Sequence, residues 1–329
     1  MQSHLFASAI AHGIMAIRHH LHKAKEMLAS EGVIDVGKSA IRFVPIEINN
    51  YIFRLQNGAG TRIMEEDWDN LIILDACRYD MFVDHIELDG TLESRISLGS
   101  SSEEFLERNF ASATHHDTVY VNANPYIPRL DLDQGTFHAV IDCINEWDQE
   151  LETIRPETVA DATKKAHETF NDKRLIAHFM QPHHPFIGEA GKNLRGTGLS
   201  LEADDERDTV IWEYLESGSA DVSLDQVWKA YKQNLDIVLS EVDSLLKELD
   251  GKTVITADHG NLLGERLSPI PSRRKFGHPY GVHTEELVRV PWFIVENGSR
   301  RDINGDTPQD QETVSDKEIE SRLEALGYK

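Results

Sequence analysis

Cysteine is scarce in this chain of 329 residues, which contains only Cys77 and Cys143. Two cysteines cannot build a disulfide framework, so a reducing compartment is expected, and we predict a cytoplasmic location. Hydrophobic runs are short as well, and none reaches the roughly 18 residues that would span a bilayer. The first residues, Met1–His4, lack the basic start of a signal peptide.

Basic residues are also few, because 33 Lys and Arg face 57 Asp and Glu and give a formal net charge of −24. Such a surface repels nucleic acid and anionic membranes, so neither is expected as a partner. Dense carboxylates suit a salt-rich cytoplasm, and we expect a halophile-like protein. An anionic substrate must then be attracted locally, either by a metal ion or by the basic cluster Arg273–Lys275.

The chain has enough length and apolar content, 40% of its residues, to bury one large α/β core. We predict a helical extension over residues 1–66, a catalytic domain over 67–296 and a polar tail over 297–329. The extension contains an amphipathic pattern from Leu5 to Leu28, expected to pack on the core, with a membrane surface or a partner as the alternative. Strand patterns alternating with helical patterns predict a three-layer α/β/α fold around a mostly parallel sheet.

Two apolar strand patterns end in an acidic residue. Asn70–Leu74 leads into Asp75, and Thr253–Thr256 leads into Asp258 and His259. In α/β sheets the carboxyl ends of strands are where ligands bind, and carboxylate and imidazole donors suit a divalent ion such as Zn²⁺ or Mn²⁺. Each motif also has a simpler interpretation: Asp75 could only cap a helix, and the segment around Asp258 and His259 could be an ordinary turn.

A serine run meets an acidic helix start in Gly99–Leu106. Ser101 followed by Glu104 is the signature of a capping box. A helix N-terminus also presents N–H groups to an anion, and a hydroxyl there, ionised by a metal, becomes a nucleophile. We therefore favour Ser101 as the nucleophile, with Ser100 and Ser102 as alternatives in the same run.

Several motifs together resemble the alkaline phosphatase superfamily, especially its sulfatase-like branch, over roughly residues 68–296. They are, in order, Asp75, the serine run, Pro182–Phe186, Thr256–Gly260 and Arg289–Trp292. The resemblance implies that Asp75, Asp258 and His259 hold a divalent metal, Zn²⁺, Mn²⁺ or Ca²⁺, together with the nucleophile. It also implies that His183 touches the anionic group or the leaving oxygen of the substrate.

Other features depart from that pattern. Sulfatases carry a Cys-x-Pro-Ser-Arg motif whose cysteine becomes formylglycine; this chain has no such motif, and we interpret Cys77 as a packing residue. Phosphotransferases of the superfamily place a further histidine before the Val-Pro strand, which implies His278 or His283 as a metal ligand. Alternatively, His278 and His283 are loop histidines that bind no metal. Lys275 is predicted to bind the anionic substrate.

These features predict a metal-dependent hydrolase of phosphate or sulfate esters with a serine nucleophile, acting on a small anionic ester or a glycan. The missing formylglycine motif favours phosphoryl over sulfuryl transfer. Two alternatives stay open: a transferase that passes a phospho-substituent to a cell-envelope glycan, and a catalytically silent binding protein of the same fold.

Overall fold

A seven-stranded sheet forms the centre of the protein in the computed structural model, which describes residues 33–195, 211–218, 222–309 and 315–326. The strand order is β2-β9-β6-β1-β5-β3-β4. The strands are β1 (Asn70–Leu74), β2 (Thr91–Ile96), β3 (His115–Asn122), β4 (Phe137–Asp142), β5 (Arg174–Phe179), β6 (Gly251–Thr256) and β9 (Arg289–Asn297). Neighbours from β6 to β4 pair in parallel, and only the two pairs made by β9 are antiparallel. The prediction of a mostly parallel sheet is confirmed.

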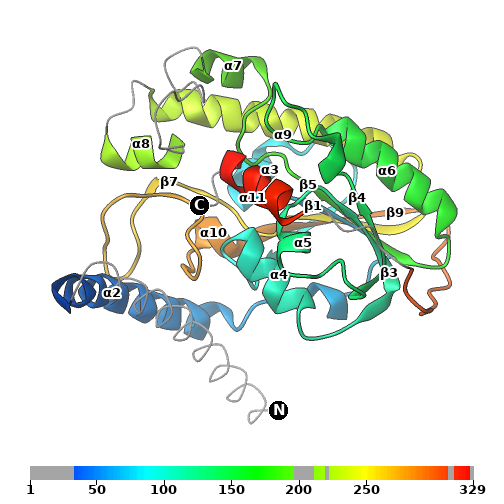
Figure 1. The fold of residues 1–329 in the computed structure, drawn as a ribbon, viewed down its shortest axis with the longest axis horizontal. Coiled ribbons are helices and arrows are strands. Elements are labelled where there is room, and N and C mark those ends of the chain that lie inside the picture. Colours follow the sequence, from blue (N-terminus) through cyan, green and yellow to red (C-terminus); the bar gives the residue numbers. More distant parts are fainter. Residues whose placement is uncertain (1–32, 196–210, 219–221, 310–314, 327–329) are drawn as a thin grey trace, which may run out of the picture.

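Helices cover both faces of this sheet (Figure 1). They are α2 (Val33–Asn57), α3 (Tyr79–His85), α4 (Ser102–Phe110), α5 (Tyr126–Arg129), α6 (Pro156–Thr169), α7 (Glu189–Arg195), α8 (Ile211–Ser217), α9 (Leu224–Leu246), α10 (Glu285–Val288) and α11 (Asp316–Ala325). Alternate residues of β1 point to opposite faces: Ile72 joins a core with α6 and α9, and Ile73 joins a core with α4, α5 and α11. The predicted α/β/α layering is therefore confirmed.

Local sequence signals place the longest helix of the second half of the chain. Ser223 Oγ accepts from the Gln226 amide at 3.3 Å, while the Gln226 side chain accepts from the Ser223 amide at 2.9 Å. This reciprocal capping box starts α9, and Ser223 followed three residues later by Gln226 is its sequence signature. The buried residues of α9 recur at helical spacing and cover β1 and β5.

A small two-stranded sheet, β7 (Leu262–Glu265) and β8 (Lys275–Gly277), follows β6 and opens the loop that returns to β9. Helix α2 lies against this region through Ile46 and Phe53. The amphipathic pattern predicted over Leu5–Leu28 lies outside the described residues, and the two boundaries between the three predicted regions stay predictions. Within the described ranges, no helix combines the length and the apolar character needed to cross a membrane.

Candidate functional site

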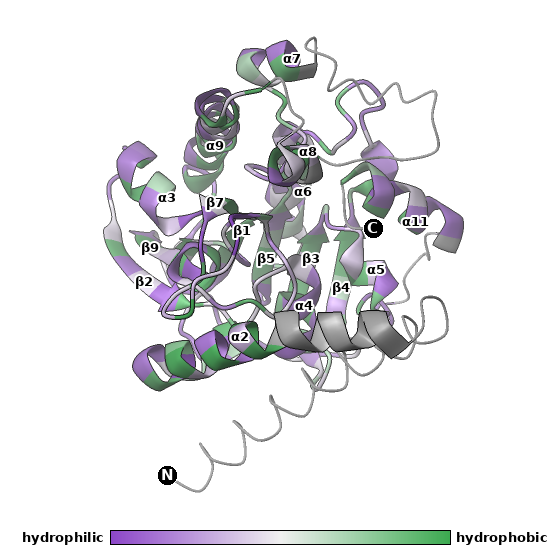
Figure 2. Ribbon diagram, turned by 90° about the vertical axis from the view of Figure 1, so that its left-hand side faces the viewer, coloured by the Kyte–Doolittle hydropathy of each residue, from purple (hydrophilic) through white to green (hydrophobic). Residues whose placement is uncertain are grey.

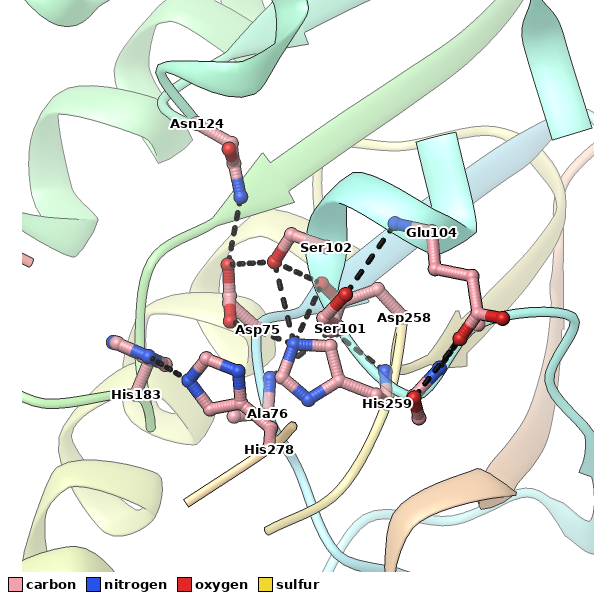
Figure 3. Close-up of polar contacts among 12 residues, drawn as sticks. Asp75, Ala76, Ser101, Ser102, Glu104, Asn124, His183, Asp258, His259 and His278 are labelled. Atoms are coloured by element: carbon pink, nitrogen blue, oxygen red, sulfur yellow. Dashed lines mark hydrogen bonds and ion pairs between the residues drawn. The ribbon is translucent and has the colours of Figure 1, made fainter. Parts of the chain in front are cut away.

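Three adjacent parallel strands bring polar side chains to one point at their carboxyl ends (Figure 3). Asp75 follows β1, Asp258 follows β6, and His178 is the second-last residue of β5. All three side chains are fully buried, and one ligand atom from each lies within 4.8 Å of the others. Such a group can hold a metal ion.

The chemistry of these donors fits a divalent cation. Two carboxylates buried this close together repel each other unless positive charge lies between them. His178 Nε2 is buried without a hydrogen-bond partner, 3.7 Å from Asp75 Oδ2 and 3.9 Å from Asp258 Oδ2. Its other ring nitrogen lies 2.8 Å from the hydroxyl of Tyr120. With a proton on Nδ1 donated to that hydroxyl, the Nε2 lone pair faces the carboxylates, as a zinc or manganese site requires.

Within the serine run, the hydroxyl that contacts the two carboxylates belongs to Ser102. Its Oγ lies 2.7 Å from Asp258 Oδ2 and 3.2 Å from Asp75 Oδ2. Ser101 is the N-cap of α4, as predicted, but its Oγ accepts from the amide of Glu104 and so faces its own helix. The preference for Ser101 as the nucleophile stays a prediction, but its hydroxyl caps the helix, whereas the hydroxyl of the next serine, Ser102, lies at the carboxylates.

Backbone and amide groups fix the two carboxylates. Asp258 Oδ1 accepts from the amides of Ala76 (3.0 Å) and His259 (2.8 Å), and Asn124 Nδ2 donates to Asp75 Oδ2 at 2.8 Å. Ala76 has φ of 58°, a left-handed conformation that is strained for alanine. Burial alone would raise the pKa of Asp258, but the His259 and His178 imidazoles and the Ser102 hydrogen bond outweigh it and lower that pKa.

Three histidines line up beside the carboxylates. His259 Nε2 lies 3.3 Å from Ser102 Oγ, and its ring centroid is 4.6 Å from that of His278. His278 in turn places its Nε2 2.8 Å from Nε2 of His183. Burial, reinforced by the neighbouring imidazoles, lowers the pKa of His183 to about 4 and that of His278 below its ordinary value. Both rings are therefore neutral at pH 7, and each can offer one N–H donor.

Two of the predicted site residues lie elsewhere. His283 Nε2 is 3.5 Å from Glu104 Oε1, and the His283 amide donates to the Asn50 side chain, so this histidine serves the contact between α2, α4 and its own loop. Lys275 Nζ is 3.4 Å from the carboxylate of Glu216 on α8. The structure thus brings six of the predicted residues together: Asp75, Ser102, His183, Asp258, His259 and His278.

Sequence reasoning missed His178, Tyr120 and Asn124. A signal for His178 was present, because it is the one ionisable side chain between two apolar residues near the end of a strand, where the neighbouring strands carry their aspartates. Tyr120 is a buried strand residue and Asn124 follows the end of β3. Nothing in the sequence alone pairs either residue with the site.

The chain resembles known proteins in its structure rather than in its sequence. No protein-family model matches the chain, and no curated protein matches its sequence. Similar solved structures include the C-terminal periplasmic domain of EcEptC from Escherichia coli in complex with Zn, with 12% identity, a TM-score of 0.46, and coverage of 69% of this chain and 72% of that one.

Another is the integral membrane protein lipooligosaccharide phosphoethanolamine transferase A from Neisseria meningitidis, with 13% identity and a TM-score of 0.46. That match covers 87% of this chain, which spans only 60% of the transferase. A protein of the alkaline phosphatase superfamily from Vibrio parahaemolyticus is 11% identical, with a TM-score of 0.37 and coverage of 80% and 67%.

Proposed function

We propose that this protein is a metal-dependent enzyme that cleaves phosphate esters with Ser102 as its nucleophile. The observation that carries the proposal is the position of Ser102 Oγ, 2.7 and 3.2 Å from two buried carboxylates. The hydroxyl also lies in the first turn of α4, where the positive end of the helix dipole favours an anionic group. We favour phosphoryl over sulfuryl transfer because the chain lacks the Cys-x-Pro-Ser-Arg motif from which sulfatases make formylglycine.

Asp75, Asp258 and His178 would hold the metal, with His259 Nε2 3.4 Å from Asp258 Oδ2 as a further donor. When bound, a divalent ion supplies Lewis-acid charge that lowers the pKa of a nearby hydroxyl. Ser102 Oγ already directs its proton at Asp258 Oδ2. Asn124 keeps Asp75 oriented through its amide.

The reaction forms a bond between Ser102 Oγ and phosphorus and breaks the bond between phosphorus and the leaving oxygen. His183 Nδ1 donates to the His184 carbonyl, so the proton between the two facing Nε2 atoms belongs to His278. His278 can therefore donate a hydrogen bond to the leaving oxygen, and water supplies the proton that this oxygen takes up. Attack on phosphorus by water or by an acceptor hydroxyl then breaks the bond to Ser102 Oγ. Hydrolysis and transfer differ only in this last step.

Two serine variants, assayed with bound metal against aryl phosphate monoesters, diesters and sulfates, test the proposal. Ser102→Ala should lower turnover by several orders of magnitude. Ser101→Ala is the matched control: it should cost about 0.5–2 kcal/mol of stability through the lost cap and leave turnover nearly unchanged. Normal turnover in Ser102→Ala would overturn the covalent mechanism, and a wild-type protein that binds metal without cleaving any ester would favour the silent binding protein.

The acceptor is tested separately by product analysis. Hydrolysis releases inorganic phosphate or a phosphomonoester into water, whereas transfer attaches the phospho-substituent to an added alcohol or glycan. If label from a phosphodiester appears on a saccharide acceptor faster than in water-derived product, the transferase alternative holds and the hydrolase assignment falls.

A further inference from the structure

Helix α9 places one side-chain amide inside the protein. The residues that α9 buries are apolar apart from Tyr231 and Asn234, and Asn234 is fully buried. An amide taken out of water costs free energy unless it forms hydrogen bonds. The partners of Asn234 must therefore explain its position, because an apolar side chain would otherwise suit this face of the helix better.

Every described hydrogen bond of the Asn234 side chain goes to one segment, residues 182–187, which we call the His183 loop. The Nδ2 group donates to three carbonyls, those of Pro182 (3.3 Å), His183 (3.0 Å) and Pro185 (3.1 Å). The Oδ1 atom accepts from the amide of Ile187 at 2.8 Å. One side chain thus spans the loop from its first residue to its last.

The His183 loop has few backbone donors of its own, because proline carries no amide hydrogen. Pro182 and Pro185 leave the two histidines between them as the backbone donors of residues 182–185. The amide of His183 donates away from the loop, to the Asp75 carbonyl at 3.1 Å. Buried carbonyls of the loop therefore need donors from elsewhere, and Asn234 supplies them.

The backbone of His183 is held on both sides of its α-carbon, by Asp75 at the amide and by Asn234 at the carbonyl. From this backbone the ring extends to His278, with 2.8 Å between the two Nε2 atoms (Figure 3). Since His183 Nδ1 donates to the His184 carbonyl, its Nε2 accepts the proton of His278. The placement of His183 therefore decides which nitrogen of His278 carries the proton.

We propose that Asn234 is a positioning residue for the pair His183 and His278, an inference that rests on the proposed cleavage of phosphate esters. Asn234 acts from the side of the sheet opposite α4, the helix that carries Ser102, as Figure 2 shows. The described hydrogen bonds of its side chain end on residues 182–187, so it acts through His183. Its effect should appear at the leaving oxygen, to which His278 donates.

Loss of the Asn234 donor should therefore slow most the esters whose leaving oxygen most needs a hydrogen bond. Phenolate keeps its negative charge largely on oxygen, whereas para-nitrophenolate spreads that charge into its ring. Asn234→Asp keeps the size of the side chain and the acceptor for Ile187 but removes the amide donor. Because a misplacement of about 1 Å costs about 100-fold in rate, kcat/KM for phenyl phosphate should fall about 10–100-fold. The loss for para-nitrophenyl phosphate should be at least about fivefold smaller.

The ratio of the two kcat/KM values separates positioning from stability, because a partly unfolded variant loses both by the same factor. Gln233→Met is the matched control. Gln233 precedes Asn234 on α9, and its Oε1 accepts from the Ala190 amide at 2.8 Å, so it holds the start of α7. This control should leave the ratio unchanged. Asn234→Leu, which is similar in size and uncharged, takes the place of Asn234→Asp if that variant does not fold.

Nuclear magnetic resonance of the full-length protein with ¹⁵N-labelled histidine reports the placement of His183 without turnover. Signals of His183, assigned with His183→Gln, should show a proton on Nδ1 in the wild type and in Gln233→Met, and should shift in Asn234→Asp. Unshifted signals, or equal losses on both esters, would overturn the positioning role. A wild type that cleaves neither ester would overturn the proposed function, and the His183 signals would still decide whether Asn234 positions the ring.

Discussion

Removal of one buried hydroxyl should weaken metal binding without disturbing the fold. Tyr120 is fully buried, and its hydroxyl lies 2.8 Å from His178 Nδ1. Burial, with the charges of Asp258 and Asp75, raises the pKa of Tyr120 well above its ordinary value, so the hydroxyl stays protonated. Tyr120→Phe keeps the ring against Phe137 and removes only the group that fixes the His178 tautomer.

The magnitude follows from what that hydroxyl does. Loss of a group that orients a metal ligand costs about 10–100-fold in metal affinity, which is about 1.4–2.7 kcal/mol. The metal-free protein loses one buried hydrogen bond, about 1 kcal/mol of its free energy of unfolding. The effect on metal affinity should thus exceed the effect on metal-free stability.

Competition with a chelator of known affinity measures the first quantity, and urea unfolding of metal-free protein measures the second. Thr163→Val is the matched control, because Thr163 Oγ1 donates to the Val159 carbonyl inside α6 and contacts no proposed metal ligand. It should lower stability by a similar amount and leave metal affinity unchanged. Equal metal affinity in Tyr120→Phe and the wild type would refute the role of His178 as a ligand.

Two further predictions concern charge. Burial raises the pKa of Asp142 to about 6, so between about pH 4 and pH 6 the folded protein holds a proton that the unfolded chain releases, and its stability should fall as the pH rises through this range. Asp142→Asn should therefore raise the free energy of unfolding at pH 8 by about 1–3 kcal/mol and change it little at pH 4. An equal effect of the substitution at both pH values would contradict this. At a net charge of −24 the surface carboxylates repel one another, and molar monovalent salt screens this repulsion, so the thermal midpoint of unfolding should rise between millimolar and molar salt. A midpoint that stays flat or falls would count against a halophile-like surface.

Much of the fold could be predicted because its signals are local. The apolar strands β1 and β6 are followed by acidic residues at their carboxyl ends, and α9 begins at a capping box, so each element is marked by its own sequence. Strand order is not local. The placement of β5 beside β1 decides that His178 meets Asp75, and that neighbourhood depends on packing between segments about a hundred residues apart.

Dependence on packing between distant segments also limits how many of the candidate metal ligands can be predicted from sequence. Two carboxylates at strand ends could be paired from sequence, since parallel strands end at one edge of a sheet. The loop histidines could not be sorted, because their positions depend on which side chains anchor the loop. Glu104 Oε2 accepts a hydrogen bond from the Gly281 amide at 3.3 Å, and Glu104 Oε1 lies 3.5 Å from His283 Nε2. These contacts anchor the loop so that His278 faces His183.

The serine run shows how two roles compete for one hydroxyl. An N-cap side chain must accept from an amide of its own helix, which turns Ser101 Oγ toward Glu104. The same oxygen cannot at once lie against carboxylates that follow other strands. Ser102, the first residue inside the helix, has no capping duty, and its Oγ reaches both Asp75 and Asp258. A strong capping signal at one serine is therefore an argument against that serine as nucleophile and in favour of its neighbour.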